Sequence, residues 1–566
     1  MEKKVAGNDA DVEEMAREES VRDASVHASE LERRYGHVNR RLRARHIQFL
    51  ALGGAIGTSL FLGIGSSLAK AGPLSLTLGF AISGMAVYGM ASLSTRHYIH
   101  IRVNNVFQDG VSGRNVYLAS CPGRDSSILR ENWYFCAIVL CLDISAATLV
   151  IDYWPGARGV SPAVWITLCL IVILFLNIFA VSIFGEAEFC FASIKLILII
   201  GLLILSVVLI LGGGPNHDRL GFRYWKDPGV MNEVAPATGA TGRFLGFFSV
   251  LIYAAFTYAG IEMIAATAGE AENPRRNVPK AVRRSIWRIL AFYVLGSFCI
   301  GCIVASNDPH LLRAQAEGAP GAARSPWVIG ITNSGIRVLP SIINVCILTS
   351  AVSSANAFLY TGSRYMYALA QNKQAPRVLL TCTKKGVPIY CVLVTALFGT
   401  LTYMTVSVAG NTVFLWFANL TTVAAMLTWI SLCYAFIRFR KAQAVQGVSL
   451  DDPACRAYRP RFQPYIAWAT LIYFVVLVVF NGFETFMRGN WNVNDFLVHY
   501  IGIPIFAFFI LFWKFVKKTK FRKLEEVDLW SGKSEVDAME GTWEEPVAKN
   551  WLQKVRSYST RPTLCE

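Results

Sequence analysis

IKLILIIGLLILSVVLIL, residues 194–211, is an almost wholly apolar stretch that carries one charge, Lys195. A helix needs about 20 mostly apolar residues to cross a bilayer. Comparable runs recur at residues 47–70, 164–184, 289–305, 392–408 and 466–480. Because hydrocarbon offers no partner to a free backbone N–H or C=O, each run must form a helix. The repeated runs predict an all-α integral membrane protein.

The composition is typical of a chain whose surface faces lipid. Of the 566 residues, 54% are hydrophobic and 16% are charged, against roughly 25% charged residues in a soluble domain. The net charge of +16 does not predict a nucleic-acid partner, because the basic residues lie mainly beside the ends of apolar runs. The one CxxC pair, Cys299 and Cys302, lies inside such a run. It lacks a second pair of ligands, so we expect no metal site.

The apolar runs and the charges together predict about twelve spans with both termini in the cytosol. The spans are expected at residues 47–70, 73–94, 133–154, 162–184, 189–212, 243–268, 286–306, 333–360, 388–408, 412–437, 464–482 and 498–516. Basic residues gather before the first span, after the last, and in the loops after the sixth, eighth and tenth. The positive-inside rule assigns all of these segments to the cytosol. We therefore expect cytosolic tails at 1–46, without a cleavable signal peptide, and at 517–566, around a membrane domain at 47–516.

Three functional classes fit such a chain: a secondary transporter, a nutrient sensor on a transporter scaffold, and an integral-membrane enzyme. The eight histidines are scattered, and no His/Asp or Cys/His grouping has a useful spacing. This disfavours an enzyme, and we expect no cofactor. The sequence has no GxxxxGK[ST] loop, which disfavours a nucleotide-driven pump. Transport would then be driven by a gradient.

Two of the predicted spans are interrupted by glycine. The first contains Gly53-Gly-Ala-Ile-Gly57-Thr-Ser59, and the sixth contains Phe256-Thr-Tyr-Ala-Gly260-Ile-Glu262. Each glycine weakens a helix by about 1 kcal/mol relative to alanine. Both segments could be breaks whose freed N–H and C=O groups hold a substrate, as in transporters with inverted repeats. Both could equally be sites of close helix packing. Glu262 is either functional or half of an ion pair between helices.

Isolated polar residues in other spans are further candidates. Lys195 lies about two turns into its span and Asp143 near the middle of the third span. Charges at such depth are costly, so each should be paired or functional. For Lys195 the alternative is a side chain that extends to the membrane surface, and for Asp143 it is a structural hydrogen bond. Ser353, Ser354 and Asn356 could bridge helices or bind a ligand.

Three stretches carry a resemblance to a known family: residues 45–65, residues 185–195 (GEAEFCFASIK) and, most specifically, residues 268–281 (AGEAENPRRNVPKA). They resemble the fungal amino acid permeases, the yeast-type amino acid transporter family of the amino acid–polyamine–organocation superfamily. The similarity covers most of residues 40–95 and 130–520. It implies a LeuT-like fold with a five-plus-five inverted repeat and two extra C-terminal helices. It also implies proton-coupled import of an amino acid across the plasma membrane.

The family's functional positions can be carried over residue by residue. The resemblance places the substrate against the first and sixth helices, at Ala55, Ile56, Gly57, Thr58, Ser59, Phe256, Thr257, Tyr258 and Ala259. It implies that Lys195 takes the place of a sodium ion in coupling transport to protons. Asp143 and Glu262 are the other candidates for proton coupling. Which amino acid is carried cannot be read from these residues, and a polyamine-, choline- or carnitine-like substrate stays open.

The chain departs from the family pattern at three places. Ser59 stands where relatives commonly have glycine, and Asp143 stands where glutamate is expected. Residues 92–130 resemble nothing in the family, which there has an amphipathic loop under the substrate site. We therefore interpret 92–130 as a possible error of the gene model. A continuous in-frame transcript across this segment would refute that interpretation.

Overall fold

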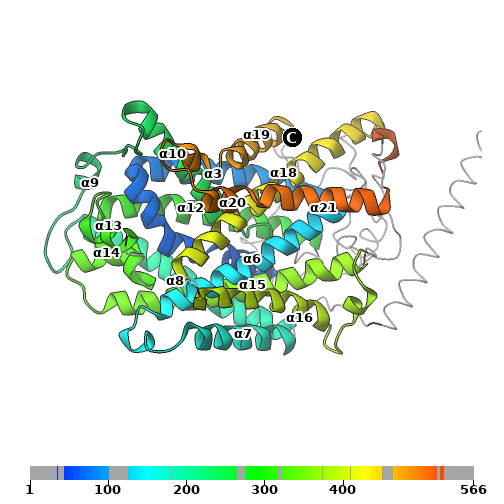
Figure 1. Cartoon of the computed structure of the whole chain (residues 1–566), viewed down its shortest axis with the longest axis horizontal. Coiled ribbons are helices and arrows are strands. Elements are labelled where there is room, and N and C mark those ends of the chain that lie inside the picture. Colours follow the sequence, from blue (N-terminus) through cyan, green and yellow to red (C-terminus); the bar gives the residue numbers. More distant parts are fainter. Residues whose placement is uncertain are drawn as a thin grey trace, which may run out of the picture.

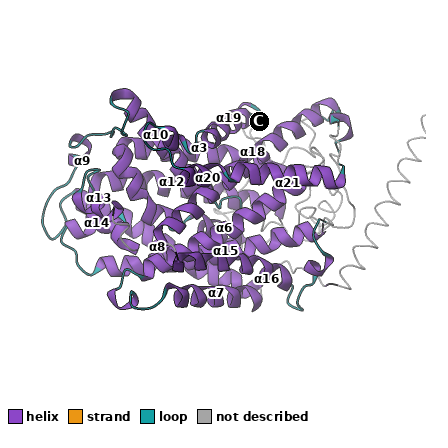
Figure 2. Ribbon diagram, viewed as in Figure 1, coloured by secondary structure: helices purple, strands orange, loops and turns teal. Residues whose placement is uncertain are grey.

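The computed structural model describes residues 35, 44–100, 125–179, 181–263, 274–316, 321–371, 374–407, 410–448, 463–518 and 523–527. Figure 2 shows helices joined by loops, and among the described residues there is no β-strand. The prediction of an all-α protein is confirmed. The predicted tails lie largely outside these ranges, as do residues 101–124 of the atypical segment 92–130. The described ends of that segment belong to helices α3 and α6.

The longer helices are α2 (Ala44–Ala55), α3 (Ile64–His100), α6 (Asp125–Ile151), α7 (Pro162–Phe179), α8 (Val181–Ile210), α10 (Gly239–Thr257), α12 (Pro274–Ile303), α15 (Leu339–Gln371), α16 (Ile389–Phe398), α18 (Gly410–Val445), α19 (Tyr465–Val479) and α21 (Gly502–Lys517). Short helices connect them: α9 (Arg223–Lys226), α13 (Pro309–Ala316), α14 (Pro326–Asn333), α17 (Met404–Ser407) and α20 (Val493–Tyr500). Single turns are η1 (Ser59–Gly63), η2 (Pro155–Ala157), η4 (Gly321–Arg324), η5 (Arg377–Leu380), η6 (Gly399–Tyr403), η8 (Phe483–Phe486) and η9 (Leu524–Glu526).

In the described part of the chain, nine helices are long and apolar enough to cross a membrane, or ten if the bent pair α20 and α21 counts as one span. The predicted number of twelve is not reached by this criterion and stays a prediction. One reason is that two predicted spans fall within a single helical stretch of 46 residues, Gln48–Leu93, which bends at Gly72 and Pro73. Another is that α19 has 15 residues, fewer than the criterion requires.

Several helices extend beyond their predicted ends. α15 was expected to end at residue 360 but continues to Gln371, past the charged Arg364. This guanidinium is accommodated inside the protein, because it lies 3.8 Å from the centroid of the Tyr360 ring and donates to the Ser363 hydroxyl at 2.9 Å. α12 begins at Pro274 rather than at residue 286. The sixth span ends early, because α10 stops at Thr257.

α6 and α15 pack along each other near the middle of the molecule, as Figure 1 shows. The Asn344 amide donates to the Val150 carbonyl at 3.0 Å, and the rings of Phe135 and Phe358 lie 5.6 Å apart. α3 packs on α10 and α12, and α2 packs on α8. α7 lies at the edge in Figure 1 and exposes apolar side chains such as Ile171. Exposed apolar helix faces of this kind suit a multi-pass membrane protein.

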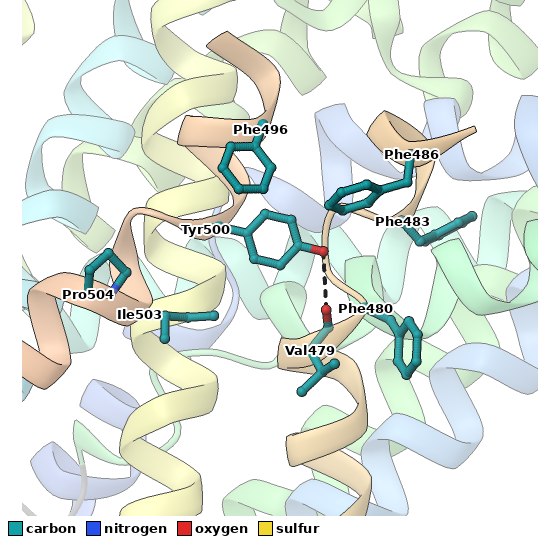
Figure 3. Close-up of a pocket in the computed structure, with 8 residues that line it drawn as sticks. All are labelled: Val479, Phe480, Phe483, Phe486, Phe496, Tyr500, Ile503 and Pro504. Carbon is teal, nitrogen blue, oxygen red and sulfur yellow. Dashed lines mark hydrogen bonds between the residues drawn. The ribbon is translucent and has the colours of Figure 1, made fainter. Parts of the chain in front are cut away.

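The C-terminal helices line an open apolar pocket of about 570 Å³ (Figure 3). Its lining comes from α19, η8, α20 and α21 and contains no charged residue: Val479, Phe480, Phe483, Phe486, Phe496, Tyr500, Ile503 and Pro504. The Tyr500 hydroxyl donates to the Val479 carbonyl at 3.1 Å. Between two of the lining residues, Glu484 forms an ion pair with Lys70 of α3. This pocket contains none of the predicted site residues.

Candidate functional site

The first predicted span is interrupted at the predicted place. α2 ends at Ala55, and the helix resumes as the π turn η1 at Ser59. Ile56 and Gly57 still donate to the carbonyls of Leu52 and Ala55, at 2.8 and 3.0 Å. The next three backbone N–H groups, from residue 58 to residue 60, donate to no acceptor in the described part of the chain. Free N–H groups at the start of a helix are suited to bind a carboxylate.

Side chains from four other helices bind the carbonyl groups freed by this break. Lys195 of α8 donates to the Gly53 carbonyl at 2.5 Å. The other donors are hydroxyl groups of Tyr293 to Ala55 at 2.5 Å, of Ser350 to Ile56 at 3.1 Å, and of Tyr253 to Ser59 at 2.7 Å. Buried carbonyls without partners would be costly, so these bonds stabilise the break. Packing of small residues alone does not account for the interrupted segment.

The sixth predicted span breaks as well. α10 ends at Thr257, and Gly260 has φ +101°, a conformation that favours glycine. The Glu262 carboxylate accepts from the Gly260 N–H at 3.2 Å and from the Trp429 indole at 3.3 Å. A Cβ at Gly260 would lie 3.0 Å from the backbone of Gly54. The two breaks therefore meet backbone to backbone.

A small cavity of about 30 Å³ lies between the two breaks. It is lined by eight of the predicted site residues: Ala55, Gly57, Thr58, Ser59, Asp143, Phe256, Thr257 and Ala259. The remaining lining residues are Gly54, Val139, Leu142, Ser354, Phe358 and Thr421. Typical ligand pockets measure about 300–1,000 Å³. In this conformation the cavity therefore has room for little more than water.

Two predicted substrate residues and two predicted coupling residues lie outside the cavity lining. Ile56 is fully buried, and the Tyr258 hydroxyl donates to the Phe80 carbonyl at 3.0 Å, so both face the protein core. Lys195 is 1% exposed and is held at Gly53, so its side chain does not extend to the membrane surface. Glu262 is bound by Gly260 and Trp429 and forms no ion pair among the described residues.

The structure adds a buried acid that the sequence reasoning passed over. Glu188 of α8 is 1% exposed. Its carboxylate accepts from the Ser353 hydroxyl at 2.8 Å and from the Asn356 amide at 3.4 Å, both on α15. Three polar candidates of the sequence analysis lie on α15. Ser353 and Asn356 bridge helices, whereas Ser354 lines the cavity. The spacing of seven residues between Glu188 and Lys195 could have indicated a shared helix face.

The matches to known proteins agree with this geometry. Residues 46–526 match the family model described as amino acid permease. The chain belongs to the amino acid permease family. This permease is 40% identical over 518 residues to the proline-specific permease of Emericella nidulans, covering 91% of this chain and 92% of that protein. It is also 40% identical to the proline-specific permease of Saccharomyces cerevisiae, with 88% and 79% covered.

Relatives named for other substrates are similar over comparable lengths. The dicarboxylic amino acid permease of Saccharomyces cerevisiae is 37% identical and covers 92% of this chain and 84% of that protein. Among solved structures, a manganese transporter from Eremococcus coleocola has a TM-score of 0.51 at 13% identity, covering 84% of this permease and 94% of that chain. This likeness concerns the fold, which is LeuT-like as predicted. The permease is thus an amino acid transporter and not an enzyme.

The most specific stretch of the family resemblance lies partly outside the described structure. Residues 268–273 of AGEAENPRRNVPKA are not described, and α12 begins at Pro274 within it.

Proposed function

We propose that this permease imports a neutral amino acid, with proline as the first candidate, together with protons across the plasma membrane. The observation that carries the proposal is the pair of broken helices that meet at one cavity. The free N–H groups at residues 58–60 would bind the substrate carboxylate. The C-terminal ends of α2 and α10 carry negative partial charge and would attract the substrate ammonium group.

The wall of the cavity supports a neutral, apolar substrate. Val139, Leu142, Phe256 and Phe358 supply apolar surface, and the lining contains no lysine or arginine that could pair with an acidic side chain. Relatives named as proline-specific permeases are 40% identical to this chain. The basic amino-acid permease of Saccharomyces cerevisiae is 36% identical.

The proposed cycle is alternating access around this site. Substrate and proton enter from outside, the segment with the two broken helices rocks against the remaining helices, and both leave to the cytosol. The charge pattern of the loops supports cytosolic termini. One proton that moves inward gains about 2.3 kcal/mol per 100 mV of membrane potential. That free energy supports roughly fifty-fold accumulation of a neutral amino acid.

Uptake of a radiolabelled amino acid panel by permease-deficient fungal cells tests the proposal. We expect proline accumulation that a protonophore abolishes. In Lys195→Ala, proton-driven accumulation should be lost while some proline binding remains, because the bond that fixes Gly53 is lost. Accumulation insensitive to the protonophore would contradict proton coupling. Nutrient signalling without uptake would instead identify a sensor.

A further inference from the structure

Glu188 is a buried acid to which the transport cycle described above gives no task. A Cβ at Gly53 would collide with its carboxylate, so the carboxylate lies against the backbone of Gly53. Gly53 is also the residue whose carbonyl accepts from Lys195. Glu188 and Lys195 are two turns apart on α8 and thus reach the same point of the first helix from one helix face.

The hydrogen bond between Asn356 and Glu188 has a fixed direction. The Asn177 amide donates to the Ile173 backbone carbonyl at 3.0 Å and to the Asn356 side-chain oxygen at 2.8 Å. The carbonyl of Ile173 can only accept, so it sets the orientation of Asn177. Asn356 must then offer its oxygen to Asn177 and its NH₂ group to Glu188.

Both oxygens of Glu188 therefore face donors. Asn356 donates to one, and the Ser353 hydroxyl donates to the other. The NH₂ group of Asn356 can only donate, which favours the ionised carboxylate, because that form can only accept; the Ser353 hydroxyl is able to serve either form. α15 presents the uncharged residues Ser353 and Asn356 to Glu188. α7 contributes Asn177, also uncharged, which contacts Asn356. α12 also packs on α8. Its basic residues Arg283, Arg284 and Arg288 are exposed on the surface of the protein. Among the side chains that the structure describes on these helices, Lys195 is the cation that lies against the same residue, Gly53, as Glu188 does.

Asp143 has the opposite surroundings. It lines the cavity, and its Oδ2 atom is buried without a hydrogen-bond partner. Ser354 lines the same cavity, and its hydroxyl group can either donate or accept. This arrangement suits both the ionised and the protonated carboxyl group. A Cβ at Gly57 would lie 3.9 Å from the Oδ1 atom, so Asp143 also lies beside the broken first helix.

We propose that Glu188 is the fixed counter-ion of Lys195, which makes Asp143 the group that loads and releases the transported proton. This inference rests on the proposed function. With all three groups ionised, one cation and two anions leave a single negative charge in the site. A proton from the outer solution bonds to Asp143, makes the site neutral, and leaves toward the cytosol after the protein reopens. Glu188 acts through Lys195 and is a positioning residue.

Proline uptake as a function of external pH tests the role of Glu188. In Glu188→Gln, Lys195 keeps its charge but loses its counter-ion, so Asp143 becomes its one neighbouring anion. Protonation of Asp143 then requires a higher proton concentration, and the pH of half-maximal uptake should fall by about one unit or more. Glu186→Gln is the matched control, because Glu186 is two residues away on the exposed side of α8. It should keep the wild-type midpoint.

Two further variants separate charge from folding. Glu188→Gln combined with Lys195→Gln removes both charges. It should lose accumulation, as Lys195→Ala does, but the pH midpoint of its remaining proline binding should lie within about half a unit of that of wild type. If Glu188→Gln does not reach the membrane, this double variant decides. Loss of the pH dependence of proline binding in the double variant, or an unchanged midpoint in Glu188→Gln, would overturn the proposal.

Asp143→Asn should still exchange labelled for unlabelled proline across the membrane but should lose pH-dependent accumulation. Retained pH-dependent accumulation would place the proton elsewhere. A wild-type protein indifferent to the protonophore would refute proton coupling itself. The wild-type control therefore separates failure of the proposed function from failure of the Glu188 assignment.

Discussion

At the scale of single residues, the two helix breaks can meet because glycine has no side chain. Its backbone atoms can therefore approach another backbone closely. Gly54 and Gly260 come from opposite ends of the membrane domain's first half, yet their backbones touch. The sequence indicated both glycines, because an interrupted apolar run is visible without a structure. It did not indicate Glu188, which lies in a polar motif near the start of α8 and resembles a residue of the membrane interface. Nor could it show that Ile56 and Tyr258 face the core.

Gly260→Ala should destabilise the protein. The new Cβ would occupy a positive-φ position and press on the backbone of Gly54, which costs on the order of 1–3 kcal/mol. Thermal unfolding of the purified protein in detergent should show a lower midpoint, and proline uptake should fall. Gly201→Ala is the control, since a Cβ there meets nothing within 4 Å. Equal unfolding midpoints for Gly260→Ala and wild type would contradict this account.

At the scale of secondary-structure elements, the two broken helices are connected through a third. Tyr293 of α12 donates to the Ala55 carbonyl at 2.5 Å and lies 3.2 Å from the Thr257 carbonyl. One buried hydroxyl thus joins the ends of α2 and α10. The membrane-spanning helices themselves could be predicted from the apolar runs of the sequence. Such cross-connections were not, because a tyrosine in an apolar helix gives no sign of which carbonyl it will meet.

Tyr293→Phe should loosen this junction. It removes the tyrosine's hydrogen bond to the buried Ala55 carbonyl, which still accepts from the Gly57 N–H, so the loss costs about 0.5–1.5 kcal/mol. We expect a lower unfolding midpoint together with slower proline uptake. Tyr465→Phe serves as the matched control, because Tyr465 is 77% exposed on α19. Should both variants behave alike in the two assays, the Tyr293 hydroxyl has no special role.

At the scale of the whole molecule, an ion pair connects α3, near the N-terminal end of the membrane domain, to the C-terminal helices. Lys70 lies just before the bend at Gly72, and Glu484 lies in η8 beside the apolar pocket. Both side chains are partly exposed, so the pair is worth about 0–1 kcal/mol. A contact of this strength can influence conformational change without fixing one state. It joins positions 414 residues apart, which the sequence gave no reason to pair.

Reversing the charges tests this connection. Lys70→Glu and Glu484→Lys should each change the maximal rate of proline uptake by less than about fivefold, in keeping with an exposed pair. Combining the two changes should return the rate toward wild type, while the unfolding midpoint stays nearly constant. Rates measured as a double-mutant cycle provide the check. Independent, additive effects would show that the two residues do not act together.

The broken first helix has a consequence for how substrate range can evolve. Groups common to all amino acids would be bound by main-chain atoms at residues 53–60, which no side-chain replacement deletes directly. The variable part of a substrate would meet the side chains of Val139, Leu142, Phe256 and Phe358. Substitutions of these side chains can then change the substrate range, while the main-chain atoms still bind the groups that all amino acids share. This division fits a family whose members, at 35–40% identity to this chain, carry names for proline, dicarboxylic, basic and lysine transport.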